Sequence, residues 1–557
     1  MTASERLYRK MAGTLTVNCV VCAIILSAAQ IVAQSDAAVA LPATNGASVQ
    51  SSATPVAGPG GHGVSGDQSE KGMGAASSAN HGTNSKGAIE DAGSTQDSPT
   101  SGATAKQLPP EEAEHQISPK EAEELFRSVD EILSFASKDT ALPIHHEVKR
   151  KLTSRDEVEK YVQKHMEDDE DAQRLRRSEL VLKKFGLLPR DFDLGSFLVK
   201  LLREQVAGYY DTTTKTVNLL DWIEPVQQKP VLAHELTHAL QDQSYDLEKW
   251  MKVADVDLGK KKVLTPDDMV RDEALTARQA VVEGQAMVVL LDYMLTPTGQ
   301  SVEKSPELLK QLQEGMLVGT ADSPEFKEAP IYLKEAMTFP YRYGVDFVAE
   351  VLIKEGKQKA YADALTHPPT TSREIMEPQK YMAGEHIEPM KLVDLEHDFK
   401  GYDRFDVGAV GEFDVAVLID QYAGVEKSKA LYREWRGGYY YAARPKGDAR
   451  APLGLFYASR WSSAEKAGQF AALYASGLKL RYAMAQEVIE GAPVTEDRTP
   501  KLGDPTPSLF GRHMWKTEEG SVVVEARGDT VFVAESLDQD TTQKLEQEMF
   551  PTEAAKK

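Results

Sequence analysis

Two histidines and a glutamate lie within five consecutive residues, His234-Glu235-Leu236-Thr237-His238. On a helix, residues four positions apart share one face, so His234 and His238 can offer two imidazole nitrogens to one metal ion. Glu235 is not needed as a ligand and can take a proton from a metal-bound water. These residue types at this spacing indicate a Zn²⁺ ion that activates water for hydrolysis, with Glu235 as the general base.

The residues around this motif favour a helix. Pro230 suits a first helical turn, and the apolar residues recur near helical spacing at Val231, Leu232, Leu236 and Leu240. The alternative is a pair of surface histidines on an amphipathic helix, which would bind no metal. We expect a metal site, because the local context fits the mechanics of the motif.

A catalytic zinc has three protein ligands and one open position, so a third ligand must come from elsewhere in the chain. Both cysteines, Cys19 and Cys22, lie in the N-terminal apolar segment, which leaves histidines and carboxylates as ligands. Glu283 is flanked by apolar residues on both sides, where an unpaired carboxylate would be costly. We predict Glu283 as the third ligand. The alternatives are a Glu283 exposed on a helix surface, and Asp272 or Glu273 as the ligand.

The motif resembles that of the thermolysin-type gluzincins, in which a glutamate on a following helix completes the zinc site. The likeness implies zinc binding by His234, His238 and Glu283. This chain departs from the family in two ways: Glu283 lies farther along the chain from His238, and the acidic residue expected four positions after it is Met287. The second-shell partner of His234 is therefore unassigned, with Asp242 and Asp272 as candidates.

A closer resemblance is to a group of little-characterised exported bacterial proteins that have HExxH and a later Glu-Gly-x-Ala. It extends over roughly residues 180–400 and implies a peptidase-like fold without indicating a substrate. The segments that carry it are Gly186-Leu187-Leu188-Pro189, Gly208-Tyr209-Tyr210-Asp211, the HExxH segment, Glu283-Gly284-Gln285-Ala286, Tyr341-Arg342-Tyr343-Gly344, and Pro368-Pro369-Thr370-Thr371-Ser372 through to Tyr381.

Hydrolysis of a peptide bond also needs a hydrogen-bond donor for the developing oxyanion. Tyr341 and Tyr343 are candidates, because their segment follows Pro340 and could enter the cleft. Burial of both rings in the core is the alternative. Gly208-Tyr209-Tyr210 could form an edge strand that pairs with an extended substrate, or could belong only to the core of a sheet.

The N-terminus has the layout of a signal peptide. Arg6, Arg9 and Lys10 precede an apolar stretch that is densest over residues 17–32, and small residues follow it. We expect an exported protein, periplasmic or extracellular. An uncleaved N-terminal anchor is the alternative and would be the protein's one link to a membrane. The net charge of −22 argues against nucleic-acid binding.

The composition predicts four segments. Residues 1–34 form the signal peptide. Residues 35–108, rich in Gly, Ser, Ala and Thr, form a disordered tether. Residues 109–398 form a mainly helical, zincin-like metallopeptidase domain with a small sheet, and residues 399–557 form a C-terminal α+β accessory domain. Its predicted strands are 439–443, 453–458, 521–526 and 530–534, and in the preceding domain we predict a hairpin over 208–220 and a long helix over about 268–295.

The sequence thus predicts an exported α+β zinc metallopeptidase that acts on a peptide or protein substrate. Two other functions stay open. One is a non-catalytic binding or scaffold protein of the cell envelope with a vestigial zinc site, although Glu235 would serve no purpose there. The other is a zinc hydrolase of non-peptide amides or esters, which nothing in the sequence separates from a peptidase.

Overall fold

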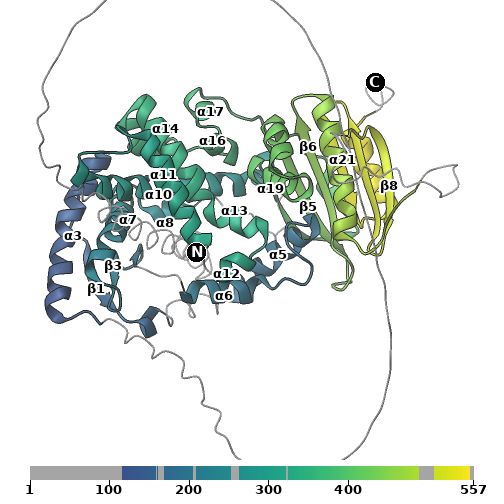
Figure 1. The fold of residues 1–557 in the computed structure, drawn as a ribbon. Helices are drawn as coiled ribbons and strands as arrows, with labels where there is room; N and C mark the ends of the chain where they lie inside the picture. Colours follow the sequence, from purple (N-terminus) through teal and green to yellow (C-terminus); the bar gives the residue numbers. More distant parts are fainter. Residues whose placement is uncertain are drawn as a thin grey trace, which may run out of the picture. The chain divides into compact units, whose positions relative to one another are not determined.

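The computed structural model of the chain describes residues 116–158, 160, 169–204, 208–252, 263–321, 324–488 and 507–551. The predicted signal peptide and tether lie outside these residues. Among the helices of the described part, none is long and apolar enough to cross a membrane. Figure 1 shows the helices and strands in chain order.

Helices dominate the described part of the chain up to residue 398 (Figure 1). In order they are α3 (Pro119–Thr140), α5 (Asp169–Phe185), α6 (Leu194–Glu204), α7 (Pro225–Tyr245), α8 (Leu247–Trp250), α9 (Pro266–Met269), α10 (Arg271–Leu295), η2 (Thr296–Thr298), α11 (Pro306–Ala321), α12 (Pro324–Glu328), α13 (Ile331–Phe339), η3 (Pro340–Gly344), α14 (Val345–Glu355), η4 (Lys359–Asp363), α15 (Ala364–Thr366), α16 (Ser372–Met376), α17 (Pro378–Met382) and α18 (Leu395–Asp398).

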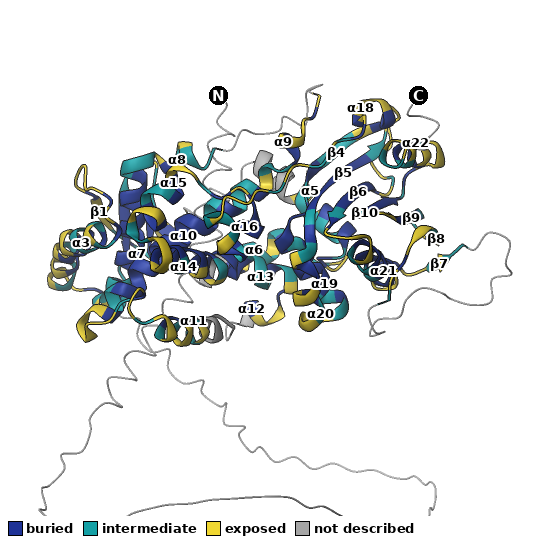
Figure 2. Cartoon of the chain, turned by 90° about the horizontal axis from the view of Figure 1, so that it is seen from above, coloured by how far each residue is buried: buried dark blue, intermediate teal, exposed yellow. Residues whose placement is uncertain are grey.

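Helices α7 and α10 form the centre of this helical part. Every residue from Val231 to Asp242 of α7 is buried, and so is every residue from Ala280 to Asp292 of α10 (Figure 2). A helix that is buried on all sides needs neighbours around it, and α7 packs against both α3 and α10. Side chains on these two helices are therefore held by a surrounding core.

A three-stranded sheet lies beside α7. Its strands β1 (Lys149–Thr153), β2 (Tyr209–Asp211) and β3 (Thr216–Leu220) occur in the order β1-β3-β2, with β1 parallel and β2 antiparallel to β3. The predicted hairpin is confirmed. The side chain of Gln228 in α7 fixes the end of β3, because its amide exchanges hydrogen bonds of 3.0 and 2.8 Å with the main chain of Leu220.

The C-terminal part contains a seven-stranded antiparallel sheet of order β4-β5-β6-β10-β9-β8-β7. The strands are β4 (Tyr402–Ala409), β5 (Trp435–Pro445), β6 (Gly454–Trp461), β7 (Ala485–Glu487), β8 (Gly511–Thr517), β9 (Gly520–Arg527) and β10 (Thr530–Glu535). The helices of this part are α19 (Glu412–Ala423), α20 (Val425–Leu431), η5 (Tyr432–Glu434), α21 (Ala464–Arg481) and α22 (Gln539–Met549).

Both faces of this sheet are covered. Side chains alternate along a strand, so Tyr440 of β5 joins the core shared with α19 and α21, whereas Tyr441 joins a second core on the opposite face. The first core continues without interruption into the helical part, since it also contains Leu236 of α7 and Val288 of α10. The domain boundary at residues 398 and 399 stays a prediction.

The mixed α+β class is confirmed, whereas several local expectations need correction. Helix α7 begins at Pro225 rather than near Pro230, so Pro230 lies inside the helix and cannot donate the hydrogen bond to the carbonyl of Val226. Strands β1, β4, β7 and β8 were not predicted.

Candidate metal centre

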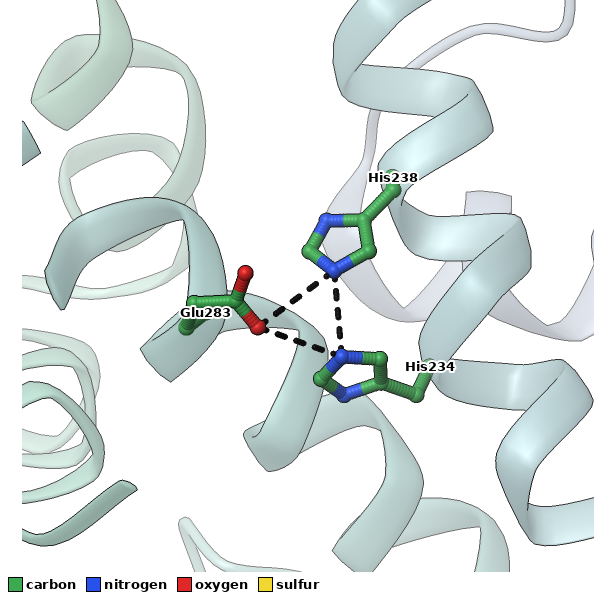
Figure 3. Close-up of side chains that lie close together, drawn as sticks. All are labelled: His234, His238 and Glu283. Atoms are coloured by element: carbon green, nitrogen blue, oxygen red, sulfur yellow. Dashed lines mark hydrogen bonds and ion pairs between the residues drawn. The ribbon is translucent and has the colours of Figure 1, made fainter. Parts of the chain in front are cut away.

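The three predicted ligands lie together. Helix α7 carries His234 and His238 one turn apart, and α10 carries Glu283, whose carboxylate points at both imidazoles (Figure 3). The Oε2 atom of Glu283 is 3.3 Å from Nε2 of His234 and 3.5 Å from Nε2 of His238. The two Nε2 atoms are 3.0 Å apart. Two imidazole nitrogens and one carboxylate oxygen therefore converge on one point.

This donor set fits Zn²⁺, which takes histidine nitrogen and carboxylate oxygen as ligands. The relative exposure of the three residues is 0% for His234, 7% for His238 and 2% for Glu283. A carboxylate buried this deeply needs positive charge beside it. The two imidazoles are the basic groups that face it, and a divalent cation between the three would supply that charge.

The electrostatics of the three groups agree with a site built around positive charge. Burial alone would raise the pKa of Glu283, but the charge of His238 and hydrogen bonds to both imidazoles lower it to about 2. Burial would likewise lower the pKa of His238, but the charge of Glu283 raises it. Burial lowers the pKa of His234 to about 4, so that this imidazole stays neutral at pH 7 and keeps a lone pair for a ligand bond.

Glu235 lies between the two histidines in sequence but takes no part in the ligand cluster. Its Oε2 accepts a hydrogen bond of 2.7 Å from the main-chain N–H of Tyr210 in β2, and its Oε1 has no hydrogen-bond partner. Burial raises the pKa of Glu235 to about 7. A carboxyl group with such a pKa can both accept and release a proton near neutral pH.

A second contact holds the β2–β3 hairpin against α7. The hydroxyl of Tyr210 donates to Oδ2 of Asp242 at 2.8 Å, and the same oxygen pairs with Nζ of Lys215 at 2.6 Å. The other carboxylate oxygen accepts the N–H of Leu247 at 3.1 Å. Asp242 is therefore engaged with the hairpin and α8 and is not the partner of His234. The Nδ1 atom of His234 has no hydrogen-bond partner.

The close approach of η3 to α10 places Tyr341 beside Glu283. A side chain at Gly284 would collide with the carbonyl oxygen of Gly344, so only glycine permits this contact. The missing side chain at Gly284 thus lets the backbone of η3 approach α10. The hydroxyl of Tyr341, which is buried, donates to Oε2 of Glu283 at 3.4 Å.

Three further candidates from the sequence, Tyr343, Glu273 and Asp272, lie outside the cluster of His234, His238 and Glu283. The ring of Tyr343 packs on Phe339 and under the guanidinium of Arg342. Glu273 accepts hydrogen bonds from the N–H and hydroxyl of Ser372 at 2.9 and 2.7 Å, ten residues before Glu283 on the same helix. Asp272 lies next to Gly408. Neither Asp272 nor Glu273 joins the ligand cluster.

A second group of potential ligands lies between α18 and α22. Ligand atoms of His397, Asp398 and Glu548 lie within 4.8 Å of one another, with only Asp398 buried. Nδ1 of His397 is 3.0 Å from Oδ1 of Asp398. Two of these three side chains are exposed, unlike those of the buried centre. Any measurement of bound metal therefore has to distinguish metal at this group from metal at the buried centre.

Comparison with known proteins yields no relative. No protein-family model, curated protein or solved structure matches this chain.

Proposed function

We propose that the protein is an exported zinc-dependent metallopeptidase of the gluzincin type, with a zincin-like domain over residues 109–398 and an accessory domain after it. The observation that carries this proposal is the convergence of Glu283 in α10 on His234 and His238 in α7. A glutamate base beside two ligand histidines has no use in a purely structural zinc site. The presence of Glu235 therefore favours a catalytic site.

When bound by His234, His238 and Glu283, zinc would polarise the substrate carbonyl and lower the pKa of a coordinated water to about 7. Glu235 would accept a proton from the attacking water and pass it to the leaving amine nitrogen. The N–H of Tyr210 would hold this carboxylate in place through both proton transfers, since it binds Oε2 and leaves Oε1 free.

Tyr341 is the proposed donor to the developing oxyanion. Its hydroxyl already lies at the ligand carboxylate, 3.4 Å from Oε2 of Glu283. A rotation of the side chain would aim the O–H at a neighbouring substrate oxygen. Tyr343 has no such contact, because its ring packs against Phe339 and Arg342, and we assign it no catalytic role.

The edge of the small sheet supports a peptide as the substrate. Strand β2 is at the edge of the order β1-β3-β2, and its main chain reaches the general base through Tyr210. An extended peptide that adds to this edge would run past Glu235. A substrate without a peptide backbone would gain nothing from the strand.

The zinc content of the purified protein and its variants tests this proposal. Full-length protein would be analysed for bound zinc beside Glu283→Ala, Glu235→Gln and His397→Ala. We expect one zinc per chain in wild type, lost in Glu283→Ala and kept in the other two, because neither Glu235 nor His397 is a ligand of the buried centre. Folded wild type without zinc, or zinc lost only in His397→Ala, would refute it and favour the scaffold function.

A further inference from the structure

Of the two histidines, His238 alone has a partner for its outer ring nitrogen. Nδ1 of His238 lies 2.9 Å from Oε1 of Gln241, which is less than one turn farther along α7. Gln241 is fully buried. An imidazole that binds metal through Nε2 keeps its proton on Nδ1, and a hydrogen bond there fixes the plane of the ring.

The orientation of the Gln241 amide follows from its neighbours. The Nε2 group of Gln285 donates to the carbonyls of Ala360 and Tyr361 at 2.8 and 3.1 Å, so its Oε1 must face the other way. That oxygen accepts from Nε2 of Gln241 at 2.8 Å. An amide nitrogen only donates and an amide oxygen only accepts. Oε1 of Gln241 is therefore turned to His238 and requires a proton on Nδ1.

The chain of amides is anchored in irregular backbone. Ala360 and Tyr361 belong to η4, a π-helical turn in which carbonyls are displaced from the regular α-helical pattern. Both carbonyls accept from Gln285 of α10, and that of Tyr361 also accepts from the main-chain N–H of Ala364. If the amide of Gln285 were turned over, its oxygen would face both carbonyls, which is unfavourable in a buried place. The π-helical turn thus sets the direction of the hydrogen bonds that run from Gln285 through Gln241 to His238.

Gln241 also binds the second ligand helix. Its Nε2 donates to the main-chain carbonyl of Val282 at 3.1 Å, and Val282 immediately precedes Glu283. One side chain therefore contacts the ring of a ligand in α7 and the backbone beside a ligand in α10. Through these contacts it governs both the direction of the His238 lone pair and the separation of the two helices.

We propose that Gln241 is a positioning residue of the metal centre: it holds His238 in the tautomer with the proton on Nδ1 and keeps α7 and α10 at the spacing that the three ligands require. This inference rests on the proposed zinc site. It assigns Gln285 and η4 the role of orienting Gln241, so that a segment about 120 residues away in sequence contributes to metal binding.

The experiment measures zinc affinity of the full chain by competition with a chelator. Gln241→Met removes the amide at similar length. Gln243→Met is the matched control, because Gln243 is on the same helix but binds the exposed main-chain N–H groups of His145 and His146. We expect zinc binding about 10- to 100-fold weaker in Gln241→Met and unchanged in the control. Gln285→Met should weaken binding less, in the same direction.

The outcomes separate the two proposals. Wild type without zinc overturns the metal centre and this role together, whereas equal zinc affinity in Gln241→Met and Gln243→Met overturns the positioning role alone. Should Gln241→Met fail to fold, nitrogen NMR of histidine-labelled, zinc-loaded wild type tests the same point. An Nδ1–H proton of His238 shifted downfield of that of His234, as the hydrogen bond to Gln241 requires, supports the role, and equal shifts of the two protons overturn it.

Discussion

The main-chain N–H of Tyr210 lies 2.7 Å from Oε2 of Glu235. In the hairpin Tyr210 is opposite Val217, and its N–H points away from β3 toward α7. The same residue binds Asp242 through its hydroxyl, so the N–H and the hydroxyl of Tyr210 both hold the edge strand against α7. The position of strand β2 and the position of the Glu235 carboxylate are thereby linked.

Replacement of Tyr210 by Phe tests this link. The variant loses the hydrogen bond to Asp242 but keeps the N–H to Glu235, so the strand should loosen while the fold persists. We expect a stability loss of about 1 kcal/mol and a lower kcat for peptide hydrolysis. The control is Tyr381→Phe, which also loses one hydroxyl bond, to the carbonyl of His367. An equal fall of kcat in both variants would contradict a specific link.

Glu235→Gln should separate metal binding from catalysis. The amide oxygen can still accept the N–H of Tyr210, and none of the ligands changes, so zinc content and thermal stability should remain close to those of wild type. An amide cannot accept the proton of water. Peptide hydrolysis should therefore fall by about 10²- to 10⁴-fold, measured as kcat/KM on a peptide that wild type cleaves. Undiminished cleavage would assign the base elsewhere.

Gly284→Ala probes the contact between α10 and η3. The new methyl group would collide with the carbonyl of Gly344, so the helices must separate beside Glu283. We expect a stability loss of about 1–3 kcal/mol in denaturant unfolding, together with weaker zinc binding. The control is Gly401→Ala, because nothing lies within 4 Å of a side-chain carbon there. Gly284→Ala with normal stability would show that the contact relaxes freely.

The sequence predicted that His234, His238 and Glu283 converge because their signals are local. His234 and His238 are related by one helical turn, and Glu283 stands out as a carboxylate in an apolar helix. Both signals depend only on neighbouring residues. The hairpin that carries Tyr210 was found for the same reason, since a turn joins two short strands.

What the sequence left open depends on contacts between distant segments. Strand β4 has exposed or half-exposed residues along most of its length and is defined by its pairing with β5. Likewise β1 is a strand because it lies parallel to β3, more than 60 residues later. Gln241 has no distinctive sequence context, and its role emerges only from Gln285 and η4. Tertiary partners, rather than local periodicity, determine these features.

A buried carboxyl group at the start of α10 makes the stability of the protein depend on pH. Burial and then the nearby charge of Asp414 raise the pKa of Glu273 to about 8, although the N–H and hydroxyl of Ser372 donate to it. Asp272 and Tyr332 also lie near this group, and Asp414 itself has a pKa raised by burial to about 6. The pocket therefore favours a neutral Glu273.

The sign of this pH dependence follows from how many protons the folded and unfolded chains bind. The folded chain retains a proton on Glu273 up to pH about 8, whereas the unfolded chain releases it near the ordinary pKa of 4.5. The free energy of unfolding that the protonated Glu273 contributes is fully present below pH 4.5. It decreases as the pH rises toward 8, by up to about 1.4 kcal/mol per pH unit. Glu273→Gln, which cannot ionise, should flatten the fall in unfolding free energy between about pH 6 and about pH 8. The control is Glu355→Gln at an exposed position, which should leave the slope unchanged. A slope in Glu273→Gln as steep as that of wild type would mean that Glu273 is already ionised in the folded protein, held by Ser372 against the charges around it.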